Sequence, residues 1–215
     1  MIDSLVTLVI GVSGGDAALG IVLFTLAVRI MVLPLGVRQA RSTRIRERLA
    51  PRLAALRKRH ARDPERLAKE TSALFAKEGS SPFAGIMPGL AQLPFLWLMY
   101  RVATHPTALA GHDLLGAPLG QQVAGVVTHY GLLSWPVLVF ALVLVLIGVV
   151  AWVTSRKIRG TLAQEQPELM RKIMPLMPYG SLLAAAVLPL AAGLYLLVST
   201  AWTVGERAVL ASRPL

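Results

Sequence analysis

The feature that most constrains the fold is a long stretch of sequence without a carboxylate, a lysine or an arginine. Between Leu114 and Ser155 there is no Asp, Glu, Lys or Arg. Charge-free stretches longer than about 18 residues, separated by basic segments, are typical of helices that cross a membrane. The alternating segments of about ten residues that would indicate a membrane β-barrel are absent. The sequence therefore predicts an all-α integral membrane protein.

The composition supports this class and argues against an enzyme. Hydrophobic residues make up 55% of the chain and charged residues 15%, whereas about 25% of the residues in a soluble domain are charged. The absence of cysteine excludes disulfides, a thiol nucleophile and cysteine-ligated metals. The sequence also lacks a glycine-rich phosphate loop, metal-binding histidine spacing and a nucleophile motif. We therefore expect no catalytic residues, no cofactor and no metal.

The alternation of apolar and basic segments predicts five spans. A span of 21 residues is about 31 Å long, which matches one hydrocarbon thickness. In chain order, the expected segments are an outer interfacial segment 1–16, a first span 17–37, a cytosolic helical hairpin 38–79, a second span 82–102, an outer loop 103–132 with some interfacial helix, a third span 134–154, a cytosolic loop 155–172, a fourth span 173–188, a fifth span 190–207 and a cytosolic tail 208–215.

Two of these assignments depend on proline. Asp63 followed by Pro64 predicts a turn in which the aspartate caps the next helix and the proline is its first residue. The apolar run 173–204 is too long for one span and short for two. A turn at Pro189 returns the basic tail to the side of the other basic loops, so the positive-inside rule favours two short spans.

The distribution of basic residues predicts the orientation. Thirteen of the 22 Lys and Arg lie between Arg38 and Lys77, and twenty are expected on the cytosolic side if Arg207, the last residue of the fifth span, is included. Because cytosolic loops carry the excess of Lys and Arg, we expect the amino terminus outside, the carboxyl terminus in the cytosol and a multi-pass location in a bacterial plasma membrane. The lipid bilayer is thus the first expected partner.

Arg29 is the most informative single residue. It lies about 18 Å along the helix from the outer end of the first span and about 12 Å from the inner end. An arginine at such a depth costs at least ~2.5 kcal/mol. We place all eleven Asp and Glu in loops, tails or interfaces, so an ion pair inside the membrane is not expected. This leaves a water-filled cavity open to the cytosol, or an arginine that snorkels to the inner interface.

Four other polar side chains in the expected spans are candidate site residues: Thr25, Gln92, Tyr195 and Ser199. Thr25 lies on the same helix face as Arg29. The alternative role for each of them is a hydrogen bond between helices.

The basic face of the hairpin can orient the chain or bind RNA, anionic lipid or protein. It lacks interleaved aromatic residues, so no sequence-specific binding of nucleic acid is expected.

Four linked motifs occur in order over residues 15–210. In Leu23–Leu35 a threonine precedes the arginine by four residues and a proline follows it by five. Residues 49–79 contain the Asp-Pro turn, and Ser81–Phe95 has the spacing Pro-x-x-Gly-x-x-Pro-x-x-x-Gln-x-Pro. Met174–Ser199 holds Met-Pro-x-x-Pro and then a proline, a tyrosine and a serine. Together these motifs resemble the core of the YidC/Oxa/Alb family of membrane protein insertases, as in its bacterial YidC-type members.

The resemblance implies five core helices around a hydrophilic groove that is open to the cytosol and to lipid. Arg29 would lie in this substrate-binding groove. The implied activity is to receive a nascent hydrophobic helix and to translocate its short polar flank without nucleotide hydrolysis. The implied partners are nascent membrane proteins, with the ribosome and the Sec translocon as further candidates. Departures from the family pattern are Ser81 in place of asparagine and Leu196 in place of the second of two tyrosines.

Two other classes of function stay open at this stage. A transporter or channel subunit could use Arg29 to bind an anionic solute, although the sequence has no inverted repeat and no pair of corresponding broken helices. A membrane scaffold could recruit ribosomes through the basic hairpin.

Overall fold

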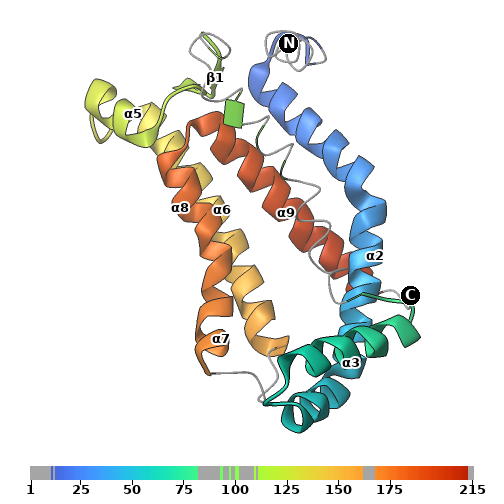
Figure 1. Ribbon diagram of the computed structural model, residues 1–215. Helices are drawn as coiled ribbons and strands as arrows, with labels where there is room; N and C mark the ends of the chain where they lie inside the picture. Colours follow the sequence, from blue (N-terminus) through green and yellow to red (C-terminus); the bar gives the residue numbers. More distant parts are fainter. Residues whose placement is uncertain are drawn as a thin grey trace. The chain divides into compact units, whose positions relative to one another are not determined.

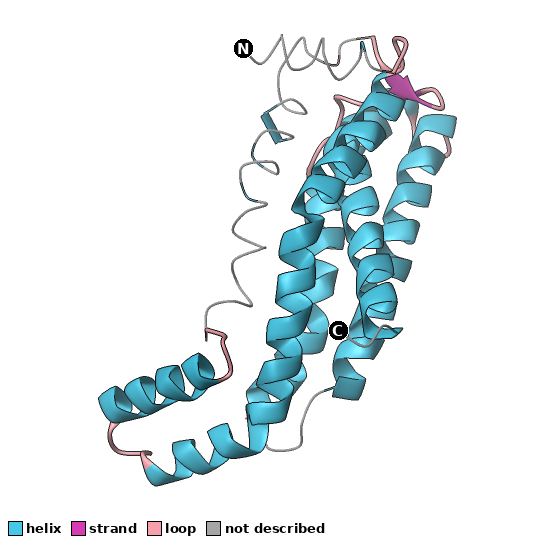
Figure 2. Ribbon diagram, turned by 90° about the vertical axis from the view of Figure 1, so that its right-hand side faces the viewer, coloured by secondary structure: helices cyan, strands magenta, loops and turns pink. Residues whose placement is uncertain are grey.

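The computed structural model describes residues 11, 13–81, 93, 97, 100, 101, 109, 111–161 and 168–212. These residues are mostly helical, in agreement with the expected class (Figures 1 and 2). The elements are α2 (Ala17–Arg59), α3 (Pro64–Lys77), β1 (Asp113–Leu114), β2 (Ala117–Pro118), α5 (Val123–Tyr130), α6 (Trp135–Thr161), α7 (Glu168–Ile173), the 3-10 helix η1 (Met174–Tyr179), α8 (Gly180–Val187) and α9 (Leu190–Ser212). The expected segments 1–16 and 82–102 lie largely outside the described residues.

Two of the described helices are long and apolar enough to cross a membrane. They are α2 and residues 135–160 of α6, whose most apolar windows have mean hydropathies of 2.3 and 3.0. The five-span arrangement stays a prediction. The chain divides into two compact units, one formed by Met1–Ile30 with Pro94–Gly205 and the other by Met31–Leu93 with Glu206–Leu215.

Helix α2 continues well beyond the expected end of the first span. It runs for 43 residues and includes both Pro34 and Pro51. At its start, the backbone N–H of Leu19 donates to the carboxylate of Asp16 at 3.1 Å, which satisfies one of the donors that a helix leaves unpaired at its amino end. The expected first span and the first arm of the hairpin are thus one helix.

The second unit contains the hairpin turn. Asp63 is the N-cap of α3, Pro64 is its first residue, and the Asp63 carboxylate accepts the backbone N–H of Arg66 at 2.9 Å. This is the cap that the Asp-Pro pair predicted. Two contacts join α2 to α3 and to the residues that follow it: Arg46 lies over the ring of buried Phe75 on α3, and the hydroxyl groups of Ser42 and Ser80, three residues past the end of α3, are 3.2 Å apart.

Replacing Asp63 with alanine is expected to destabilise α3 by about 1 kcal/mol, because the loss of an N-cap carboxylate leaves a helix donor unpaired. Hydrogen exchange at the Arg66 amide, measured in bicelles, should accelerate by about fivefold. Asp63→Asn keeps an accepting oxygen and serves as the control. Equal exchange rates in the alanine and asparagine variants would contradict this role of the carboxylate.

The core of the first unit lies where α6, α8 and α9 meet. Gly193 of α9 approaches both neighbours, since a Cβ there would lie 3.7 Å from Val143 of α6 and 3.9 Å from Ala185 of α8. Ile147 and Leu190 are fully or almost fully buried in the same cluster. The chain turns between α8 and α9 at Leu188 and Pro189, the position at which the proline predicted a turn.

The segment expected as an outer loop contains one helix, α5, and a two-residue antiparallel strand pair that the sequence did not predict. This segment also caps α9. The N–H groups of Leu190 and Ala191 donate to the carbonyl oxygens of Gln121 and Leu119, each at 3.0 Å. Because these donors have no partner within the helix, the loop completes the start of α9.

Candidate functional site

The candidate site is centred on Arg29, a half-buried residue in the part of α2 that belongs to the first unit. Its Nε donates to the hydroxyl oxygen of Ser199 on α9 at 3.1 Å, and its terminal Nη2 donates to the same oxygen. The guanidinium is therefore held against α9 by two donors on one oxygen. These residues are 170 positions apart in the sequence.

Tyr195 extends the site by one helical turn. Residues four apart lie on the same face of a helix, so Tyr195 and Ser199 face the same way from α9. Tyr195 is 4% exposed, and its side chain lies close to both Ser199 and Arg29. The first unit thus brings together three of the five residues predicted for the groove.

The two remaining predicted residues have different positions. Thr25 is one turn before Arg29 and is almost fully buried, but its hydroxyl donates to the carbonyl of Ile21 on its own helix at 2.6 Å. This intrahelical bond satisfies the donor of a buried hydroxyl. Gln92 lies outside the described residues.

The electrostatic character of the site follows from the chemistry of arginine. A guanidinium stays protonated in proteins and carries five N–H donors in a planar fork. The site therefore provides a permanent positive charge, and the hydrogen bonds to Ser199 orient the guanidinium group that carries it. A charge of this kind attracts carboxylates, and its effect is largest where water is scarce. In the described part of the chain there is no group of three or more His, Asp and Glu residues that could hold a metal ion.

Sequence reasoning missed the environment of Glu206. We expected this acid among the loops, tails and interfaces, but α9 remains helical through Ser212. In the second unit, the half-buried Glu206 carboxylate lies against the backbone of Gly36, where even a Cβ would collide with it. The signal that could have revealed this contact is a glycine within a helical sequence, which often marks close approach.

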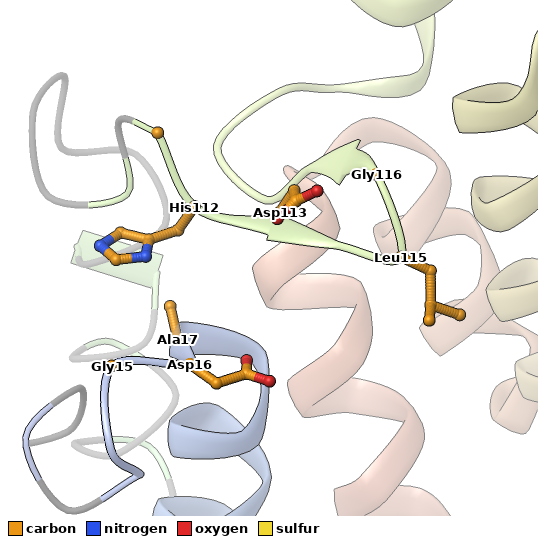
Figure 3. Close-up of a pocket in the computed structure, with 8 residues that line it drawn as sticks. Gly15, Asp16, Ala17, His112, Asp113, Leu115 and Gly116 are labelled. Carbon is orange, nitrogen blue, oxygen red and sulfur yellow. The ribbon is translucent and has the colours of Figure 1, made fainter.

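A second feature that the sequence did not single out is an open cavity of about 530 Å³ in the first unit. Its lining includes Asp16 before α2 together with His112 and Asp113 around β1 (Figure 3). The labelled side chains point in different directions, and the Asp16 carboxylate is already engaged by the backbone of α2. The cavity therefore has polar walls without a convergent set of ligands.

The fold and the site describe a helical membrane protein with a charged group on the apolar helix α2. Comparison with known families identifies its class: the model of the 60Kd inner membrane protein family matches residues 9–214. The chain therefore belongs to this family, and the predicted resemblance to the YidC/Oxa/Alb insertases is confirmed.

Individual relatives agree with the family assignment. The chain is 28% identical to the membrane protein insertase MisCA of Bacillus subtilis, over 95% of this chain and 72% of that protein. It is also 28% identical to the membrane protein insertase YidC of Alkalihalophilus pseudofirmus, over 89% of this chain and 69% of that protein. It is 33% identical to YidC of Oceanobacillus iheyensis, where the match spans about half of each protein, 54% of this chain and 48% of the relative.

Proposed function

We propose that the protein is a membrane protein insertase that accepts nascent hydrophobic helices and moves their short polar flanks across the bilayer. The observation that carries the proposal is the half-buried Arg29, hydrogen-bonded to Ser199 between two helices of the first unit. The membership of the chain in a family whose relatives are named insertases supports it.

The proposed groove contains Arg29, Thr25, Gln92, Tyr195 and Ser199 and opens to the cytosol and to lipid. A charged residue at the centre of a bilayer costs about 2.5–3.5 kcal/mol or more, which makes translocation of a polar flank slow. A hydrated groove that reaches partway through the membrane shortens the apolar path. The positive charge of Arg29 then attracts acidic residues of the flank into this groove.

The driving force of the proposed reaction is supplied by the substrate. Moving an apolar helix from water into lipid releases about 25 cal/mol per Å² of buried apolar surface. A substrate span with several hundred Å² of such surface can therefore offset the transfer of one or two charges. For this reason we propose a mechanism without nucleotide hydrolysis, metal or cofactor.

The proposed topology has five spans, an outer amino terminus and a cytosolic carboxyl terminus. In this topology the basic hairpin is in the cytosol, where nascent chains leave the ribosome. We propose nascent membrane proteins as substrates, with the ribosome and the Sec translocon as partners at this face.

Reconstitution of the purified protein into liposomes tests the function. We expect protease-protected insertion of a small single-span substrate with an acidic flank, in the absence of nucleotide, at a rate at least tenfold above that of empty liposomes. The same vesicles should show no flux of small anionic solutes. Solute flux without insertion would instead indicate a transporter or channel subunit. Ribosome binding without insertion, lost on deletion of residues 45–75, would indicate a scaffold.

A further inference from the structure

Two short apolar tips protrude from the first unit at the end where α6 begins. One is Leu115, in the turn between β1 and β2, with 67% of its surface exposed. The other is formed by Leu132 and Leu133, between α5 and α6, which are 72% and 92% exposed. We refer to these three leucines as the apolar tips. Leucines with this degree of exposure bury little of their surface within the described part of the protein, and several of them on one surface form the kind of apolar patch that marks an interaction site.

The backbone of the first tip shows that a leucine is not the residue this turn prefers. Leu115 has a φ of 50°, and the following Gly116 has a φ of 84°. Two consecutive positive φ values in a two-residue hairpin correspond to a type I′ turn, for which Asn-Gly is strongly favoured. A leucine in the left-handed region is strained relative to asparagine. Neither the turn geometry nor contact with water explains this leucine, whereas an apolar environment does.

Trp135 joins the two tips into one surface. Its indole Nε1 donates to the carbonyl oxygen of Leu115 at 2.7 Å, and Gly116 lies close to its ring, since a Cβ there would be 3.6 Å from Cδ1. Trp135 is the first residue of α6 and lies two positions after Leu133 in the sequence. The turn and the segment are therefore held beside the start of the same helix.

The surroundings of the tips identify lipid as their partner. Helix α6 is the more apolar of the two candidate spans. Beyond the tips, the exposed apolar surface continues along α6 with Leu138, Leu142 and Val145. Trp135 and Tyr130 are both exposed beside the tips, and these two residue types concentrate at membrane interfaces. No Asp, Glu, Lys or Arg occurs between Leu114 and Ser155 to keep this surface in water.

We propose that Leu115, Leu132 and Leu133 form a lipid anchor that inserts into the leaflet in which α6 begins. Trp135 lies at the interface and couples the two tips. The anchor reaches beyond α6, because the backbone that follows the first tip accepts the N–H groups of Leu190 and Ala191 at the start of α9. Insertion of the tips therefore holds the start of α9 at a defined depth. This inference does not depend on the insertase activity.

A depth measurement tests the anchor. Because the natural chain has no cysteine, a single cysteine at position 133 or 115 can carry an environment-sensitive nitrobenzoxadiazole probe in liposomes of phosphatidylcholine and phosphatidylglycerol. Thr128, an exposed polar residue on α5, is the matched control position. We expect nitroxide groups on the lipid acyl chains to quench the probes at 133 and 115 at least threefold more than the probe at 128. Aqueous iodide should show the opposite order.

Two results would overturn the proposal. Equal iodide quenching at 133 and 128, without quenching by lipid, would place the tips in water. Protection at 133 from both quenchers would mean that protein covers the tips, and a dependence on protein-to-lipid ratio would identify a second copy. The variant Leu115→Asn fits the positive φ of the turn and so preserves the strand pair. In this variant we expect lipid quenching at 133 to fall at least twofold, and unchanged quenching would contradict a joint anchor.

Discussion

Replacing Arg29 with alanine is expected to reduce insertion of a substrate with an acidic flank by at least tenfold in reconstituted liposomes. The guanidinium provides both a permanent charge and the two hydrogen bonds to Ser199. A hydrogen bond to a charged group contributes about 1.5–3 kcal/mol, and about 1.4 kcal/mol corresponds to a factor of ten in rate. The measurement is the initial rate of protease-protected insertion at a fixed protein-to-lipid ratio.

The controls separate charge from general damage to α2. Arg57→Ala removes an exposed arginine from the same helix and should leave the rate within a factor of two. Arg29→Lys retains the charge but loses the planar fork of donors, so it should be intermediate. A substrate with a neutral flank should lose less activity in Arg29→Ala than the acidic one. Equal losses for both substrates would contradict an electrostatic role.

The contact between Arg29 and Ser199 can be tested as a pair. Ser199→Ala is expected to lower the insertion rate about threefold to tenfold, because the guanidinium loses the oxygen that orients it. If orientation is the role of Ser199, the alanine change should have almost no effect in the Arg29→Ala background. Additive losses would mean that the two residues act independently.

The hydration of the site can be probed at the same position. A cysteine at position 29 should react with a water-soluble maleimide added from the cytosolic side. Lack of reaction, with normal reaction of a cysteine at exposed position 57, would indicate a dry environment packed between helices. This outcome would contradict the hydrated groove on which the proposed mechanism depends.

Replacing Ile147 with alanine is expected to have the largest effect on stability. Ile147 is fully buried on α6 within the cluster that contains residues of α8 and α9. Isoleucine-to-alanine changes in soluble cores cost about 2–5 kcal/mol through transfer and cavity terms. Between membrane helices the driving force is chiefly close packing, so we expect a loss of about 2 kcal/mol. Reversible unfolding in mixed micelles with increasing dodecyl sulfate measures it.

Val145→Ala is the matched control for this prediction. Val145 lies on the same helix, two residues earlier, and its side chain is 61% exposed. Truncation there leaves no cavity, so the change in unfolding free energy should stay within about 0.5 kcal/mol. Similar losses for the two variants would mean that the cluster around Ile147 does not hold the three helices together.

The features that could be predicted from the sequence depend on neighbouring residues. The absence of charge from Leu114 to Ser155 indicated an apolar helix, and Asp63-Pro64 indicated a capped helix start. The position of Pro189 indicated the turn between α8 and α9. In each case the cause is local. Charged residues are costly within a segment that crosses the membrane, the Asp63 side chain reaches the backbone three residues later, and the proline ring lacks the N–H group that would continue a helix.

The end of the first span illustrates what the sequence alone left open. The change from apolar to basic residues at position 38 indicates where a membrane edge is expected, but polarity does not end a helix. Arginine is a good helix former, and α2 continues to Arg59. The strand pair in the outer loop was missed because two-residue strands have no periodicity, and because its turn carries Leu115 where asparagine is typical.

By itself, the sequence determined the helical membrane class, the turns and the presence of an arginine that requires a polar partner. Only the tertiary structure decided which partner this is. Thr25 shares a helix face with Arg29 but bonds to the backbone of Ile21, while Ser199, 170 residues away, accepts the guanidinium. A contact between distant segments depends on how their helices are packed, and no local pattern of residues encodes that distance.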